Sequence, residues 1–317
     1  MIPDKQLPIT RADDSERIAA TRRGMHDRLA NLPMLGPDDA RPRFDSGDTM
    51  PLRVEFVRQL KRRRTQLVAL LLLLLPLIMA LAFKVGGSGG NDRGGAALVG
   101  LATEGAGNFA LFTEFAAVGF LLVVLVAMFC GDTIASEASW SSLRYLLAMP
   151  IPRARLLRQK LLVALAFCFG VNLLLPAWAY VLGGVFFGWG PAKSPFGGSF
   201  SYSDTAQRMV IVVVYASLQA LVVAGLAFLL SVLTDAPLAA VGGATFLVVV
   251  SNILDSITAL DPYRMVLPTH FQYSWLDALT PSISWQDMIR GTALAAIYSA
   301  IFFTAAWTRF ARKDITS

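Results

Sequence analysis

Residues 65–83 read TQLVALLLLLLPLIMALAF, a run of nineteen residues without a charged side chain. An α-helix needs about 20 residues to cross the ~30 Å hydrocarbon core of a bilayer. The run therefore predicts a membrane-spanning helix.

Five further uncharged runs have a similar length and are rich in Leu, Val, Ala and Phe: 115–131, 161–183, 209–234, 236–254 and 291–308. None shows the regular polar and apolar alternation of a barrel strand. The chain is also 55% hydrophobic and only 16% charged, a balance unlike that of soluble domains. The predicted fold class is an all-α membrane protein with six transmembrane helices.

Residues 1–50 differ in composition from the rest of the chain. They hold eight Lys and Arg and nine Asp and Glu with few large apolar residues, which predicts a mobile, solvated N-terminal extension. No apolar segment typical of a cleaved signal peptide follows the first basic residues. The sequence thus predicts two parts, the extension 1–50 and a six-span domain 51–317.

The positions of Lys and Arg predict the orientation. Fourteen of them lie before the first span, between the second and third spans, or after the sixth, whereas six lie in the alternate connections. Basic residues close to spans favour the cytoplasmic side. We therefore expect a multi-pass protein of the cell membrane with both termini in the cytoplasm.

The segment PLRVEFVRQLKRRR, residues 51–64, precedes the first span. Its apolar residues recur at helical spacing, which predicts an amphipathic helix on the inner membrane surface, with these side chains towards lipid: Leu52, Phe56, Val57 and Leu60. The alternative is a basic anchor that only fixes topology.

The sequence contains none of the common catalytic motifs. No phosphate-binding G-x-x-x-x-G-K-[ST] loop occurs, and two histidines, His26 and His270, exclude a histidine-rich metal site. We expect no catalytic residue, no metal and no nucleic-acid partner. Cys130 and Cys168 are expected to be separate packing residues.

Polar residues inside the predicted spans are few. Asn172 and Gln219 are the main ones, and they either line a pathway or form hydrogen bonds between helices. Glu114 and Asp132 are expected at span ends, which disfavours ion-coupled transport because such carriers bury ionisable groups.

The two predicted cytoplasmic connections differ in length. The link between spans four and five, SVLTDAP, predicts a tight antiparallel helix pair, whereas the link between spans two and three is about thirty residues long. Within the longer link, Leu143, Leu146 and Leu147 share one helical face and Pro150 ends the helix. We expect that face to dock against another surface. The outer link 255–290 carries prolines and aromatic residues, which predicts short interfacial or re-entrant helices or a folded surface loop.

These features resemble the permease subunits of type-2 ABC transporters. In that family the corresponding loop runs from an acid through polar residues, Gly-Thr, a leucine pair and a proline to basic residues. This chain has Glu137, Ser141, Ser142, Leu143, Leu146, Leu147, Pro150, Arg153 and Lys160. The ending RFARKDITS is also similar, and the resemblance covers residues 51–317. Ser141 and Ser142 depart from the common Gly-Thr.

The resemblance implies a function. The loop would be a coupling helix held by a separate ATP-binding subunit, with Glu137, Ser141, Ser142, Leu143, Leu146, Leu147, Pro150 and Arg153 as the coupling residues. Two permease copies, identical or different, would pair above two ATPase subunits. ATP and Mg²⁺ would bind to those partners, and the permease would export a hydrophobic or amphipathic substrate. The competing interpretations are a self-sufficient carrier or channel and a membrane scaffold that moves no solute.

Overall fold

The computed structural model describes residues 52–86, 100–139 and 153–312, all of which belong to the unit Met50–Ser317. These segments contain helices, turns and one isolated β-bridge, Lys193 to Ser199, but no strand. Six of the described helices are long and apolar enough to cross a membrane. The protein is therefore a helical, multi-pass membrane protein, as the sequence predicts. The predictions for residues 1–50, for the coupling helix within 140–152 and for the extreme C-terminus fall outside the described residues.

The six long helices follow the predicted runs with extended ends: α3 (Arg63–Gly86), α6 (Leu121–Ser139), α8 (Arg153–Phe187), α9 (Tyr202–Leu233), α10 (Pro237–Asp255) and α11 (Gln286–Ala311). A shorter helix, α2 (Leu52–Leu60), precedes α3. Pro76 and Pro176 lie inside α3 and α8, which continue past them. The helices extend beyond the predicted runs because their ends contain charged residues, and the runs were defined as uncharged.

The second predicted span is wrong in its bounds. The run 115–131 is divided between α5 (Ala106–Val118) and α6, and the break falls at Gly119 and Phe120. A Cβ on Gly119 would lie 2.6 Å from the hydroxyl of Tyr273, so only glycine fits here without displacing that side chain. The break therefore lies against a residue that is far along the chain.

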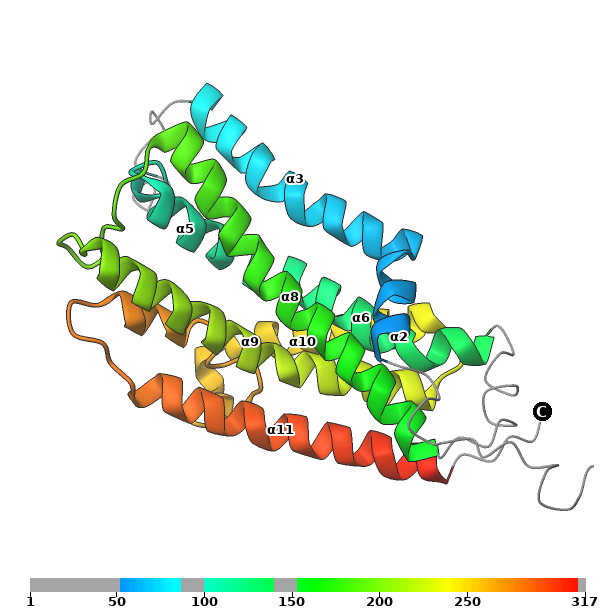
Figure 1. Ribbon diagram of the computed structural model, residues 1–317. Coiled ribbons are helices and arrows are strands. Elements are labelled where there is room, and N and C mark those ends of the chain that lie inside the picture. Colours follow the sequence, from blue (N-terminus) through cyan, green and yellow to red (C-terminus); the bar gives the residue numbers. More distant parts are fainter. Residues whose placement is uncertain (1–51, 87–99, 140–152, 313–317) are drawn as a thin grey trace, which may run out of the picture. The chain divides into compact units, whose positions relative to one another are not determined.

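Helix α9 has a central position in the bundle. It packs against α6, α8, α10 and α11, while α3 lies on the other side of α8, as Figure 1 shows. Three residues, 234–236, connect α9 to α10, which confirms the predicted tight pair. The largest hydrophobic cluster joins α6, α8, α9 and α10 and includes Phe129, Leu175 and Phe228.

The link between α10 and α11 contains three short 3₁₀ helices: η1 (Thr258–Leu260), η2 (Tyr263–Val266) and η3 (Ser274–Leu279). Its second half folds back into the bundle, where η3 contacts α9 and α11 and Trp275 is fully buried. Arg208 of α9 donates hydrogen bonds to the carbonyls of Ala278, Thr280 and Pro281. The link is thus a packed part of the bundle.

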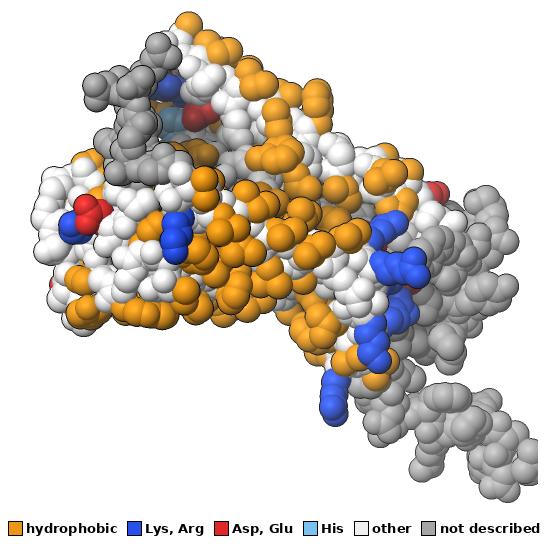
Figure 2. All heavy atoms as spheres, turned by 90° about the horizontal axis from the view of Figure 1, so that it is seen from above, with side chains coloured by type: hydrophobic (Ala, Val, Ile, Leu, Met, Phe, Trp, Pro, Cys, Tyr) orange, Lys and Arg blue, Asp and Glu red, His pale blue; other side chains and the backbone are white. Residues whose placement is uncertain are grey.

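The surface of the described residues separates charge from apolar area. Figure 2 shows a broad area of hydrophobic side chains, with Lys and Arg side chains concentrated at one end. We call this the basic end; Figure 1 shows that it holds α2, the start of α3, the end of α6, the start of α8 and the end of α11. A wide apolar surface bordered by cations suits a protein embedded in lipid.

Candidate functional site

The predicted coupling residues lie within the segment 140–152 or directly beside it. Ser141, Ser142, Leu143, Leu146, Leu147 and Pro150 lie outside the described residues. Arg153 begins α8, and Glu137 lies in the last turn of α6. The structure therefore describes the two helix ends that hold this segment.

Glu137 is not in a loop, in contrast to the prediction. Its carboxylate lies 2.5 Å from the ammonium of Lys160 on α8 and 2.6 Å from the guanidinium of Arg58 on α2. The side chains of Glu137 and Lys160 are only 2% and 1% exposed. Glu137 is therefore a buried ion-pair partner that connects three helices, and sequence reasoning missed this because α6 continues beyond its uncharged run.

Glu55 of α2 completes this buried ion cluster. Its carboxylate lies 3.4 Å from the Lys160 ammonium, and its side chain is 4% exposed. The cluster of Glu55, Arg58, Glu137 and Lys160 holds two positive and two negative charges. Such balance is needed because an unpaired buried charge is costly.

Helix α2 turns its polar side towards the protein. Glu55 and Gln59 are buried, whereas the predicted apolar residues Leu52, Phe56, Val57 and Leu60 are exposed on the described surface. Phe56 also stacks on Phe167 of α8, with ring centroids 4.7 Å apart. The exposed apolar side is the one that an amphipathic helix presents to lipid.

A second ion pair fixes the start of α3. Asp132 of α6 accepts hydrogen bonds from Arg64 and from Arg62, the latter at 3.4 Å. Asp132 lies well inside α6, not at the end of a span as the sequence predicts. Together with the cluster around Lys160, this pair attaches the α2–α3 region to α6 and α8.

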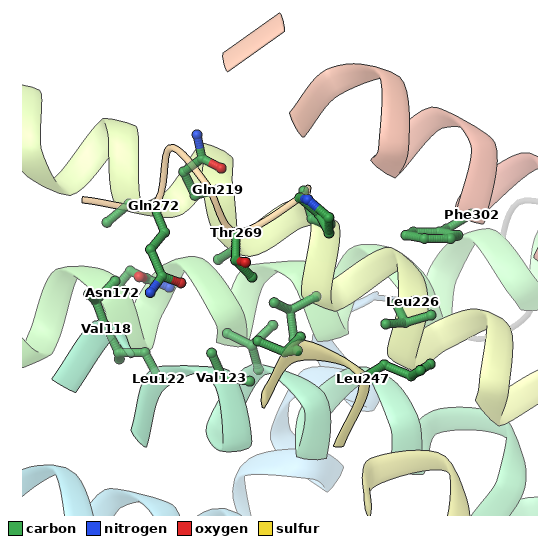
Figure 3. Close-up of a pocket in the computed structure, with 17 residues that line it drawn as sticks. Val118, Leu122, Val123, Asn172, Gln219, Leu226, Leu247, Thr269, Gln272 and Phe302 are labelled. Carbon is green, nitrogen blue, oxygen red and sulfur yellow. The ribbon is translucent and has the colours of Figure 1, made fainter. Parts of the chain in front are cut away.

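The two predicted pathway residues meet at a cavity of about 280 Å³. Asn172 of α8 and Gln219 of α9 line it together with Thr269 and Gln272 from the α10–α11 link. Figure 3 shows the Gln272 side chain extending from that link towards Asn172. We call this space the central cavity. It is bounded by α5, α6, α8, α9, α10, α11 and the α10–α11 link within a single chain.

The hydrogen bonds of these amides run within their own helices. The Asn172 side chain donates to the carbonyl of Cys168 at 2.8 Å. The Gln219 side chain donates to the Tyr215 hydroxyl at 2.8 Å, which donates to the carbonyl of Phe271 at 2.6 Å. Both residues line the central cavity, and the hydrogen bonds of their NH₂ groups do not join two helices directly. A role in a pathway stays a prediction.

Two further features were missed by sequence reasoning. Cys130 and Cys168 are neighbours, with sulfur atoms 3.6 Å apart between α6 and α8. Glu114 of α5 is fully buried, and neither carboxylate oxygen has a hydrogen-bond partner among the described residues. Within residues 52–86, 100–139 and 153–312, no cluster of His, Cys, Asp and Glu suits a metal ion.

Tyr273 follows the cavity residue Gln272 in the chain, and its hydroxyl lies beside Gly119 at the α5–α6 break. Burial raises the pKa of its phenol. Its ring lies 5.2 Å from that of Phe115. Because Tyr273 and Gly119 are far apart in the sequence, no local sequence pattern could have identified their contact.

Comparison with known proteins identifies related chains. Residues 97–316 match the family described as "Protein of unknown function (DUF2705)". The "Uncharacterized protein YhcI" of Bacillus subtilis (strain 168) is 27% identical over 219 residues, which cover 66% of this chain and 67% of YhcI. The family match includes α5 to α11 and begins after α3.

Proposed function

Since this chain belongs to the DUF2705 family, whose description assigns no activity, we propose a function from its residues. We propose that it is the membrane-spanning permease subunit of an ATP-driven ABC exporter. The substrate is hydrophobic or amphipathic, and a separate subunit hydrolyses ATP. The observation that carries the proposal is the buried ion pair between Glu137 and Lys160, on the two helices that flank segment 140–152.

This pair supports a coupling role for the segment. A segment that receives force from a partner must be attached to rigid elements, because a loose loop would absorb the displacement. The ion cluster joins the last turn of α6, the second turn of α8 and helix α2. A push on 140–152 would therefore move these three helices together.

The displacement has a route to the central cavity. The Ser231 hydroxyl of α9 accepts hydrogen bonds from the backbone N–H groups of Ile134 and Ala135, both at 3.0 Å. This contact ties α9 to α6 close to the ion cluster. Since α9 also carries Gln219, a shift of α6 would change the shape of the cavity.

The proposal includes the partners that the family resemblance implies. Two permease copies pair, and two ATP-binding subunits hold their 140–152 segments from the cytoplasm. ATP and Mg²⁺ bind to those subunits. Export as the direction, and the cell membrane as the location, follow from the same resemblance.

The test is co-purification from native membranes. The tagged chain should retain a P-loop ATPase, identified by mass spectrometry, and Leu146→Asp should remove it because a charge on the docking face is incompatible with a buried contact. Leu146→Met, which keeps an apolar side chain of similar volume, is the matched control and should retain the ATPase. Glu137→Arg is unsuitable here because it would bury a cation beside Lys160.

Two outcomes contradict the proposal. One is that the unmodified chain retains no ATP-binding protein. The other is that Leu146→Asp, with an unchanged melting temperature, retains the ATPase and its coupled hydrolysis. Either result would remove the docking role of segment 140–152.

Glu114 supports a second candidate function, a self-sufficient carrier driven by an ion gradient. A buried carboxylate without a hydrogen-bond partner among the described residues is typical of groups that bind and release a proton or cation. Purified protein in vesicles, without any ATPase, would then move solute when an ion gradient is applied. Glu114→Gln would abolish that flux, whereas under the exporter proposal there is no such flux to abolish.

A further inference from the structure

The walls of the central cavity are mainly apolar. Most of the lining side chains are aliphatic, among them Val118, Leu122, Ala220, Val223, Leu226 and Val248. Phe302 of α11 adds an aromatic ring. An occupant must therefore have an apolar body to gain from leaving water or lipid.

No lining residue of the central cavity is ionisable. A charged occupant would lose its hydration without gaining a counterion, which is strongly unfavourable. The volume of about 280 Å³ is close to the lower end of the range for ligand pockets, about 300–1,000 Å³. The cavity therefore suits a small uncharged molecule or one end of a longer one.

The amides of Asn172 and Gln219 are polar groups in this mainly apolar lining. Each uses its NH₂ group in a hydrogen bond within its own helix. Among the described residues, these two bonds are the side-chain hydrogen bonds of the amides, neither involves the carbonyl oxygen of the amide itself, and both side chains are buried. These oxygens are acceptors that a ligand with an O–H or N–H group would satisfy.

We propose that the central cavity of each chain binds one uncharged amphiphile, with an apolar body and a neutral hydrogen-bond donor directed at Asn172 and Gln219. The site lies within one bundle, so binding needs no second copy. The inference concerns binding, so it holds or fails independently of the partner ATPase.

Three photoreactive probes of equal chain length test the chemical class: a diazirine-bearing decanol, its methyl ether and the corresponding decanoate. The alcohol should label lining residues of the full-length protein in lipid nanodiscs, saturating near one probe per chain. The ether lacks the donor and the decanoate carries a charge, so each should label about five- to tenfold less. Labelled peptides are identified by mass spectrometry.

Two variants locate the site. Gln219→Leu removes an acceptor and should reduce labelling by the alcohol to the level of the ether. Gln66→Leu, on the exposed side of α3, is the matched control and should have no effect. Ala220→Leu fills the cavity but leaves both amides in place, so it should also reduce labelling and decides the matter if Gln219→Leu does not fold.

The ligand could come from the bilayer or from the aqueous phase. If the unmodified protein retains neutral lipid after extraction from the membrane and Ala220→Leu does not, the bilayer is the source. Competition by a water-soluble alcohol or amide without retained lipid identifies a solute. Equal labelling by all three probes, or labelling that neither variant changes, overturns the proposal.

Discussion

Lys160→Met is the substitution that tests the buried ion cluster most directly. Methionine has a similar length and no charge, so the change removes the cation while keeping the packing volume. Glu55 and Glu137, which lie 3.4 and 2.5 Å from the ammonium, would remain as buried carboxylates. Arg58, whose side chain is 46% exposed, would still lie beside both carboxylates.

The expected loss is large because one partner of a buried pair is removed. Such changes typically cost about 3–5 kcal/mol, and the remaining contact with Arg58 favours the lower value. For a chain of this size, about 3 kcal/mol corresponds to a decrease in Tm of roughly 5 °C. Unfolding followed by tryptophan fluorescence in detergent measures this difference.

Lys193→Met is the matched control. Lys193 forms an ion pair with Glu104 at 2.6 Å, but the two side chains are 48% and 45% exposed. Exposed pairs contribute about 0–1 kcal/mol, so Tm should change by no more than about 2 °C. Adding Glu55→Gln and Glu137→Gln to Lys160→Met removes the two carboxylates that faced the ammonium and should recover part of the loss. If Lys160→Met and Lys193→Met have the same small effect, the argument from burial is wrong.

Three other predictions concern the packing of the α10–α11 link. Gly291→Ala would place a Cβ 2.3 Å from the Tyr215 hydroxyl and 2.6 Å from Cβ of Phe271, so it should destabilise the protein by about 1–3 kcal/mol in a thermal unfolding assay. Gly242→Ala is the control: it has open space around it and should be neutral or stabilising in the same assay. Arg208→Met removes the donor to three carbonyls of the link, so backbone amides of 278–285 should exchange hydrogen at least tenfold faster. Arg290→Met, on the exposed surface, is the control and should leave their exchange unchanged. Burial, and then the nearby Asp287, raise the pKa of Asp277; the folded state therefore binds the proton more tightly than the unfolded state, and stability decreases as pH rises from about 4 through the raised value. Asp277→Asn should flatten this part of the Tm-versus-pH curve, and an identical slope in the variant would contradict the assignment.

The sequence predicts the spanning helices well because the constraint is local. A run such as 65–83 must be helical to satisfy its backbone in hydrocarbon, whatever its neighbours are. The tight α9–α10 connection is predictable for the same reason, since its few residues leave no alternative path. These features depend on composition and length alone.

Features that depend on distant contacts could not be predicted. The break between α5 and α6 lies where Tyr273 packs against Gly119, and Glu137 inside α6 is paired with Lys160 as a counterion. A charged residue is therefore an unreliable sign of where a helix ends. Asn172 and Gln219 were identified from their polarity within apolar runs, but their position at one cavity required the packing of α8 and α9.

The contact between Glu55 and Lys160 joins residues 105 positions apart, and this separation has a consequence for biosynthesis. Arg58, which lies 3.4 Å from Glu55, is translated with it, whereas Lys160 follows only after α6. The buried contact of α2 with Lys160 can therefore form only after α8 has been inserted. Final docking of the earliest described helix is a late event in assembly, and a chain truncated before α8 would lack the buried cation for Glu55.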